Sequence, residues 1–139
     1  MITIANHTVT AKVRPEALFA EWADMASWPE WNLDTEWVRL DGPFATGSTG
    51  VLKPKGGPKV RFVLDSVVPH SEFVDVSRLF GARLTFAHYV STDSDGTTSL
   101  RVLVTLDGPL AKVWNRILGG GIAKSLPPDT ERLLRRAGA

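Results

Sequence analysis

The residue best placed for acid–base chemistry is His88, in the segment RLTFAHYV (83–90). In a strand, successive side chains point to opposite faces, and the more apolar face packs on the core. The more apolar face here carries Leu84, Phe86, His88 and Val90. An inward histidine titrates near neutrality and could serve as a general acid, a general base or a polar anchor. A core histidine held by one hydrogen bond fits the same pattern.

The segment FVDVSRL (73–79) alternates in a way that allows two orientations. If Phe73 points inward, Asp75 and Ser77 do so too, and a buried Asp75 would need a partner. If the two intervening valines point inward, Asp75 is exposed. Of the two orientations we expect the second, with Asp75 on the surface.

Several kinds of site are disfavoured by composition. The chain has 139 residues, no cysteine and three histidines without metal-ligand spacing. These counts exclude disulfides, thiolate metal sites and a cysteine nucleophile, and we expect no metal. The segment GPFATGST (42–49) lacks the lysine of a P-loop, no G-x-S-x-G elbow exists, and we expect no cofactor. Hydrophobic residues make up 43% of the chain and charged residues 22%, which is typical of one globular domain over residues 1–139.

The charge balance bears on partners and location. Sixteen basic residues against fifteen acidic ones give a net charge of +1, which argues against nucleic-acid binding. The basic segment LKPKGGPKVR (52–61) is expected to be an exposed hairpin tip, with an anion-attracting patch as the alternative. The N-terminus does not resemble a signal peptide, and no apolar run reaches the ~18 residues of a membrane span. We expect a cytoplasmic protein without a membrane span.

The order of the elements follows from hydrophobic periodicity and turn residues. A strand is predicted over residues 2–12, and a helix begins at Pro15. Ser27 and Glu30 have the spacing of a capping box, which predicts a second, short helix. From residue 35 to 107, alternating segments separated by turn residues predict about six antiparallel strands.

A long C-terminal helix is predicted after Asp107-Gly108-Pro109. Its apolar residues recur three and four apart at Leu110, Val113, Trp114, Ile117, Gly121 and Ile122. Gly119–Gly121 should weaken the helix by about 1 kcal/mol per glycine, and Pro127-Pro128 should kink or restart it. We expect one bent helix. The three glycines leave room either for a cavity or for close packing.

Three segments carry a family resemblance: FAEWADMASWPEWN (19–32), VRLDGPFATGSTGVLKPKGGPKVRFVLDSVVP (38–69) and LTFAHYV (84–90). With the order of elements, they resemble the START-like superfamily, also described as Bet v 1-like, SRPBCC or polyketide cyclase/dehydrase-like. The resemblance implies an α+β helix-grip fold. In that fold a curved antiparallel sheet of about seven strands wraps around a long C-terminal helix, with two short helices after strand 1. A cavity lies between sheet and helix.

Four of the five tryptophans lie between residues 22 and 37. Trp22 is on the apolar stripe of the first helix and should be core. Trp28 and Trp31 lie on the short helix that closes one end of the cavity in this fold. Because an indole buries a large area and keeps a polar N–H, we expect Trp31 to be half core and Trp28 to act as a lid. Plain packing of both is the alternative.

The leading hypothesis is noncatalytic binding of a small hydrophobic molecule, lipid-like or polyketide-like, by a monomer or homodimer. The expected pocket residues are Trp28, Trp31, Phe62, Leu64, Phe86, His88, Trp114, Ile117 and Gly121. The resemblance also allows an enzyme of the polyketide cyclase/aromatase type, without metal or cofactor, in which His88 is the acid/base. A third possibility is an interaction module whose pocket has collapsed. Fold alone does not decide among these.

Overall fold

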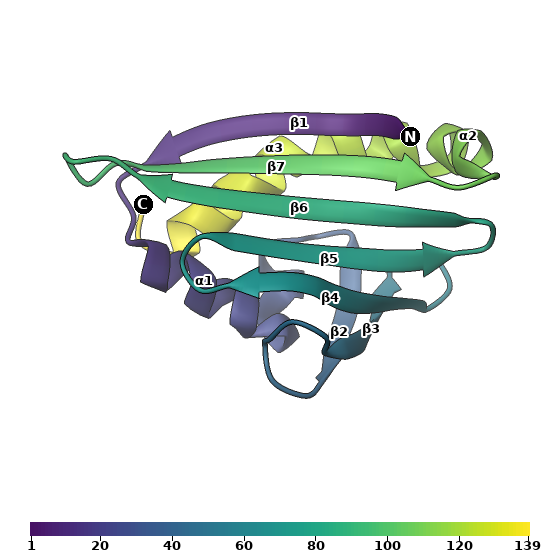
Figure 1. The fold of residues 1–139 in the computed structure, drawn as a ribbon, viewed down its shortest axis with the longest axis horizontal. Helices are drawn as coiled ribbons and strands as arrows, with labels where there is room; N and C mark the ends of the chain where they lie inside the picture. The colour runs from purple at the N-terminus through teal and green to yellow at the C-terminus, as the bar shows by residue number, and fades with distance from the viewer.

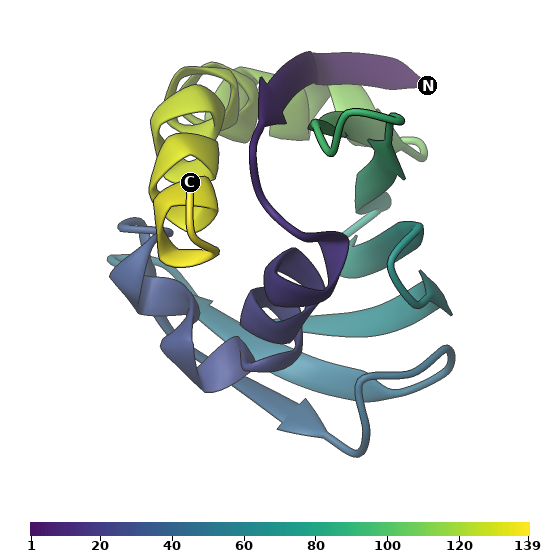
Figure 2. The same ribbon diagram turned by 90° about the vertical axis from the view of Figure 1, so that its left-hand side faces the viewer.

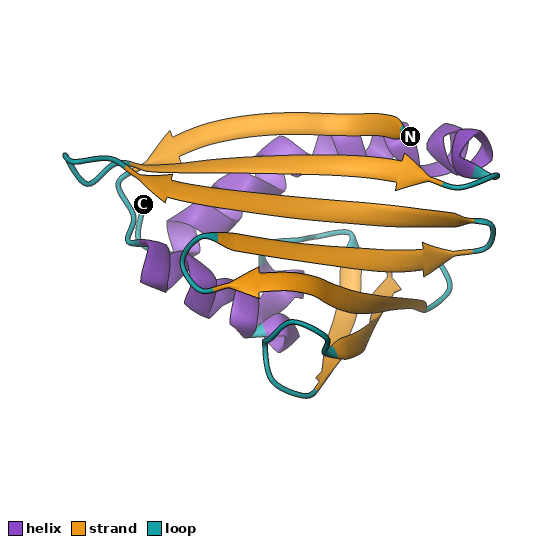
Figure 3. Ribbon diagram, in the orientation of Figure 1, coloured by secondary structure: helices purple, strands orange, loops and turns teal.

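The computed structural model describes residues 1–139, and its elements follow the predicted order (Figures 1 and 3). The strands are β1 (Ile2–Ala11), β2 (Thr35–Asp41), β3 (Thr49–Pro54), β4 (Val60–Val68), β5 (Glu72–Leu79), β6 (Ala82–Thr92) and β7 (Thr98–Asp107). The helical segments are α1 (Pro15–Ala23), η1 (Met25–Glu30), α2 (Ala111–Trp114), η2 (Asn115–Gly119) and α3 (Gly120–Arg136). This is the helix-grip arrangement that the sequence resemblance predicted.

All seven strands form one antiparallel sheet in the order β1-β7-β6-β5-β4-β3-β2. Bulges interrupt the register between Thr3 and Ala5, between Thr35 and Trp37, and between Leu64 and Ser66. A bulge bends its strand and increases the local twist, which helps a sheet to curl. Figure 2 shows the curled sheet with α3 across its open side and α1 beside it.

The concave face of the sheet carries the core, as the alternation predicted. On β7 the inward side chains are almost completely buried: Leu100, Val102, Val104 and Leu106. On β6, Leu84, His88 and Val90 are buried in the same way. Phe62 and Leu64 are buried on β4. The inward orientation of His88 is therefore confirmed.

The expected exposure of Asp75 is wrong. Phe73 is fully buried, and Asp75 and Ser77 are 8% and 9% exposed on the same face of β5. The reason is the register, because Phe73 pairs directly with His88 on β6 and so shares its concave face. The valines of β5 lie on the convex face, where they stay half-buried.

The short helices differ from expectation in one detail. α1 begins at Pro15 as predicted. The second segment is a 3₁₀-helix that begins at Met25, so Ser27 lies inside it and does not cap it. The Ser27 hydroxyl instead donates to the Asp24 carbonyl at 2.7 Å. The capping-box prediction was therefore wrong, although the helix itself exists.

The C-terminal helical run is continuous through Pro127-Pro128, which agrees with the expectation of one helix rather than two. The two prolines remove N–H partners from the carbonyls of Ala123 and Lys124, and both of these residues are exposed, so water can replace the lost partners. The irregular segment is η2, a π-helical turn. There a Cβ on Gly119 would lie 2.2 Å from Asn115 Oδ1, so a larger residue would require the Asn115 amide to move. None of the helices combines the length and apolarity needed to cross a membrane.

Candidate functional site

A cavity of about 380 Å³ lies between the concave face of the sheet and the C-terminal helical run. Of its 26 lining residues, 15 are hydrophobic, so most of the wall is apolar. The structure brings six of the nine expected pocket residues to this wall: Trp28, Trp31, Phe86, His88, Ile117 and Gly121. Gly121 faces open space, because nothing lies within 4 Å of where its Cβ would be.

Three expected pocket residues lie elsewhere. Phe62 and Leu64 are buried in the core at 5% and 0% exposure and do not line the cavity. The Phe62 ring packs against Gly50, where an added Cβ would approach it to 2.4 Å. Trp114 donates its Nε1–H to the Phe80 carbonyl at 2.7 Å. That bond holds Trp114 at the turn between β5 and β6, away from the cavity.

The two tryptophans of WPEWN share one role. Trp28 and Trp31 are equally buried, at 7% exposure, and their ring centroids are 5.4 Å apart. Trp28 Nε1 donates to the Trp22 carbonyl at 3.1 Å, whereas Trp31 Nε1 is buried without a partner. The structure does not divide them into core and lid as expected, because both indoles are core residues that also form the cavity wall.

Hydrogen bonds and ion pairs of two arginines on α3 hold the segment that contains Trp28 and Trp31. Arg132 on α3 donates from Nε to the Trp31 carbonyl at 3.0 Å and pairs with the Asp129 carboxylate. One turn later, Arg136 pairs with Glu21 at 3.0 Å and with Glu30 at 3.4 Å. The tryptophan segment is thus tied to α3 by side chains from both elements.

His88 is held in one orientation. Its Nδ1 lies 2.8 Å from the Phe73 carbonyl, and its ring stacks on the Phe73 ring at 4.6 Å between centroids with an interplanar angle of 8°. Burial lowers the pKa of His88 to about 4, against a smaller raising effect of the Phe73 carbonyl. The imidazole is therefore neutral at pH 7. Because a carbonyl only accepts, the proton is on Nδ1, and Nε2 is an acceptor without a protein partner.

Asp75 is the second unusual group in the cavity wall. It is 8% exposed and forms no hydrogen bond or ion pair with the protein. Burial alone raises the pKa of its carboxyl to about 7. A buried polar group without a partner is rare in folded proteins and commonly marks a functional site.

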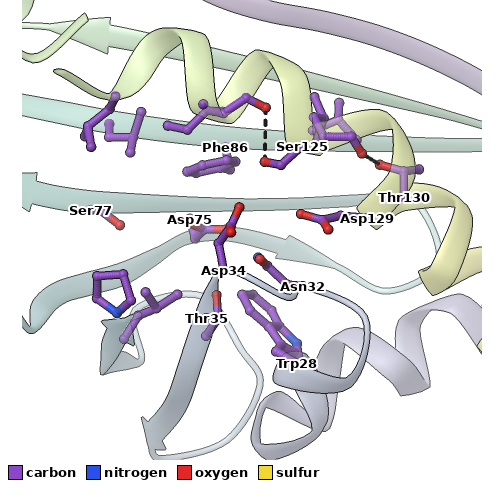
Figure 4. Close-up of a pocket in the computed structure, with 18 of the residues that line it drawn as sticks. Trp28, Asn32, Asp34, Thr35, Asp75, Ser77, Phe86, Ser125, Asp129 and Thr130 are labelled. Atoms are coloured by element: carbon purple, nitrogen blue, oxygen red, sulfur yellow. Dashed lines mark hydrogen bonds between the residues drawn. The ribbon is translucent and has the colours of Figure 1, made fainter. Parts of the chain in front are cut away.

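The remaining polar wall residues come from the segment after η1, from β2 and β5, and from α3. They are Asn32, Asp34, Thr35, Ser77, Ser125, Asp129 and Thr130. Figure 4 shows Asp34, Asp75 and Asp129 reaching toward the same part of the cavity from three different elements. No group of three or more histidine and carboxylate side chains is arranged to hold a metal ion.

The sequence interpretation missed this polar cluster. Asp34, in the loop before β2, is exposed and lies at the mouth of the cavity. On the helix, Ser125 and Asp129 continue the spacing of Leu118 and Ile122 by steps of three and four, a signal that could have found them.

Comparisons with known proteins agree on the fold. No family model matches the chain, and no curated protein does. Among solved structures, an aromatase/cyclase from Streptomyces sp. R1128, Zhui, has a TM-score of 0.74 at 14% identity, covering 96% of this chain and 92% of its own. A START superfamily protein from Mycobacterium smegmatis has a TM-score of 0.66 at 13% identity, with coverages of 95% and 92%. The protein Ara h 8.0201 has a TM-score of 0.64 at 14% identity, with coverages of 93% and 96%.

These likenesses confirm the resemblance to START-like and Bet v 1-like proteins at the level of the fold. They extend over nearly the whole chain. At such low identity, the chemistry has to be argued from the side chains of the cavity.

Proposed function

We propose that this protein binds a small hydrophobic molecule, lipid-like or polyketide-like, in the cavity between the sheet and α3. The observation that carries the proposal is the cavity itself, about 380 Å³ with a mostly apolar wall and a few polar groups at one side. Ligand sites in proteins typically have volumes of ~300–1,000 Å³ and this kind of lining. An interaction module with a collapsed pocket is less well supported, because it would have no such space. Cytoplasmic location, the oligomeric state and the absence of a metal or cofactor stay predictions.

The first experiment is native mass spectrometry of freshly purified protein, followed by denaturing extraction of any bound molecule. A stoichiometric adduct supports the proposal and gives the chemical class of the ligand. Apo protein is then titrated with N-phenyl-1-naphthylamine, a neutral dye that fluoresces in apolar surroundings. Absence of both an adduct and dye binding contradicts the proposal.

Filling the cavity should abolish dye binding. Gly121 lines the cavity and has open space beside it, so in Gly121→Phe the ring occupies the ligand volume. We expect the Kd of the dye to rise at least about tenfold. The dye can no longer bury its rings in the cavity, and burial of an apolar group of side-chain size is worth roughly 1.5–3 kcal/mol. The matched control is Gly120→Phe, because Gly120 also has open space but does not line the cavity. Equal weakening in both variants would show that the dye binds elsewhere.

A second candidate function is catalysis of polyketide cyclisation. The favouring observation is that His88 and Asp75, whose pKa values are displaced by burial, face one cavity. Neutral His88 could accept a proton at Nε2 from a carbon between two ketones. The resulting enolate carbon would attack a second carbonyl of the same chain. Protonated Asp75 would give its proton to the alkoxide oxygen that forms.

The catalytic candidate predicts that His88→Gln separates turnover from binding. We expect turnover of a poly-β-ketone substrate to fall about 10²-fold or more, the usual contribution of a general acid or base. The Kd of the substrate should stay within about threefold, because glutamine keeps a polar group at the same place. Turnover is followed by liquid chromatography of the cyclised product, and Kd by calorimetry. Equal losses of turnover and of substrate affinity would mean that His88 only anchors the ligand, and binding would then remain as the function.

A further inference from the structure

The charged groups of the cavity wall are all acidic. Asp34, Asp75 and Asp129 line the cavity, and no lysine or arginine does. Asp129 is paired with Arg132 behind it, and Asp34 is exposed at the mouth. Asp75 alone is both buried and without a partner. The cavity therefore offers an uncompensated negative group inside an apolar wall.

The hydrogen-bonding groups of the wall are mainly acceptors. The Ser125 and Thr130 hydroxyls donate to the helix carbonyls of Ile122 and Leu126 at 3.4 and 2.7 Å, as the dashed lines in Figure 4 mark. Their oxygens can then only accept from a ligand. His88 uses its one N–H on the Phe73 carbonyl, which leaves Nε2 as an acceptor. Side-chain donors remain on Asn32, Thr35 and Ser77, and the indole N–H groups of Trp22 and Trp31 are buried in the wall without a partner.

Asp75 and His88 face the same ligand volume. Asp75 pairs with Phe86, and Phe73 pairs with His88, so the two groups are diagonal neighbours on adjacent strands of the concave face. Diagonal neighbours on paired strands lie ~7–8 Å apart, which is close enough for their side chains to contact the same group. A single polar head group between the strands could contact both.

We propose that the hydrophobic molecule bound in this cavity carries a protonated amine, which lies between the Asp75 carboxylate and Nε2 of His88. This inference rests on the proposed binding function and specifies its ligand class. A primary ammonium has three donors and no acceptor, which complements a wall of acceptors and supplies the missing partner of Asp75. The indoles of Trp28 and Trp31 line the same cavity, and aromatic faces also attract cations. A fatty acid would bring its carboxylate among acidic groups with no cation to receive it.

The test compares three ligands that differ only in the head group: octylamine, octan-1-ol and octanoate. Their equal chains bury equal apolar area, so differences in Kd report the head group. Each is titrated by calorimetry at pH 8 and by displacement of N-phenyl-1-naphthylamine. We expect octylamine to bind at least about tenfold more tightly than octanoate, with octan-1-ol between them.

Asp75→Asn should remove this preference. The variant keeps the size of the side chain and loses the charge, so octylamine and octan-1-ol should then bind within about threefold of each other. Asp65→Asn is the matched control, because Asp65 is exposed on β4 and does not line the cavity. Equal affinities of the three ligands, tighter binding of octanoate, or an amine preference that survives Asp75→Asn would each overturn the inference while the binding function stands. If none of the ligands and no dye binds, both fail.

A pH series on the wild-type chain gives a readout that needs no variant. The other titratable or charged groups at this site are His88 on β6, Asp34 before β2, and Asp129 with Arg132 on α3. His88 stays neutral above a pKa of about 4. With a pKa of Asp75 of about 7, its ionised fraction grows about tenfold from pH 6 to pH 8, so octylamine affinity should rise by about that factor. Octan-1-ol affinity should stay constant, and an octylamine affinity that is also constant would contradict the inference.

Discussion

Asp75→Asn is expected to make the protein more stable at pH 8, by roughly 2–4 kcal/mol, and to lose this advantage near pH 4. Asp75 is buried without a partner, and burial raises the pKa of its carboxyl from 3.8 to about 7. Above pH 7 the wild-type chain therefore holds an unpaired charge in an apolar wall. Asparagine fills the same volume without that charge.

The direction of this pH dependence of stability follows from proton binding. Between pH 3.8 and about 7, the folded chain keeps a proton on Asp75 that the unfolded chain has lost. The contribution of Asp75 to stability is thus complete below pH 3.8, falls as the pH rises to about 7, and stays low above that. His88 acts in the opposite sense. Burial lowers its pKa from 6.5 to about 4, so its contribution is lost as the pH falls from 6.5 to 4.

These opposing contributions offset each other in the wild-type chain between pH 4 and 6.5. In Asp75→Asn only the His88 contribution remains, and stability should rise with pH over that range. Urea unfolding of the wild-type chain, Asp75→Asn and the exposed control Asp65→Asn at five pH values from 4 to 8 measures this. Stability curves of wild-type and Asp75→Asn that run parallel across this range would mean that Asp75 titrates as an ordinary surface carboxyl.

Much of the fold was predictable because its signals are local. The β7 segment TSLRVLVTL (98–106) places Leu100, Val102, Val104 and Leu106 at alternate positions, and these four residues are buried. Pro15 marked the start of α1, and turns rich in glycine, proline and serine separated the strands. The orientation of β5 was not predictable in this way. Both of its faces contain apolar residues, and the choice depends on which face of β6 it pairs with.

The site was only partly predictable for a similar reason. Strand parity placed Phe86 and His88 on the concave face, where the cavity is. The same parity placed Phe62 and Leu64 there as well, yet the cavity does not reach them. Parity identifies a face of the sheet, whereas the position of the cavity along it depends on the path of α3. That path brings Asp129 to the wall. Helical spacing indicates which face of α3 carries Asp129, but not where α3 crosses the sheet.

The largest loss of stability is expected from Phe73→Ala, about 3–5 kcal/mol. Phe73 is fully buried at the centre of an aromatic cluster. Its ring lies 4.6 Å from the ring of His88, 5.0 Å from Phe44, 5.5 Å from Trp22 and 6.1 Å from Trp28, measured between centroids. Removing the ring leaves a void that four aromatic neighbours cannot fill without moving. Phe80→Ala is the matched control, because Phe80 is 83% exposed and should cost less than about 0.5 kcal/mol.

The same variant separates the two interactions that hold His88. Nδ1–H of His88 donates to the backbone carbonyl of residue 73, so alanine retains this hydrogen bond, while the stacked ring is lost. Water entering the vacated space would reduce the burial that lowers the pKa of His88, and that pKa should move from about 4 toward 6.5. Histidine proton resonances followed by NMR against pH give this value. An unchanged pKa of His88 together with a large loss of stability would mean that the core closes over the void. In that case the burial of His88 depends on Trp22, whose ring centroid is 5.0 Å away, and not on Phe73.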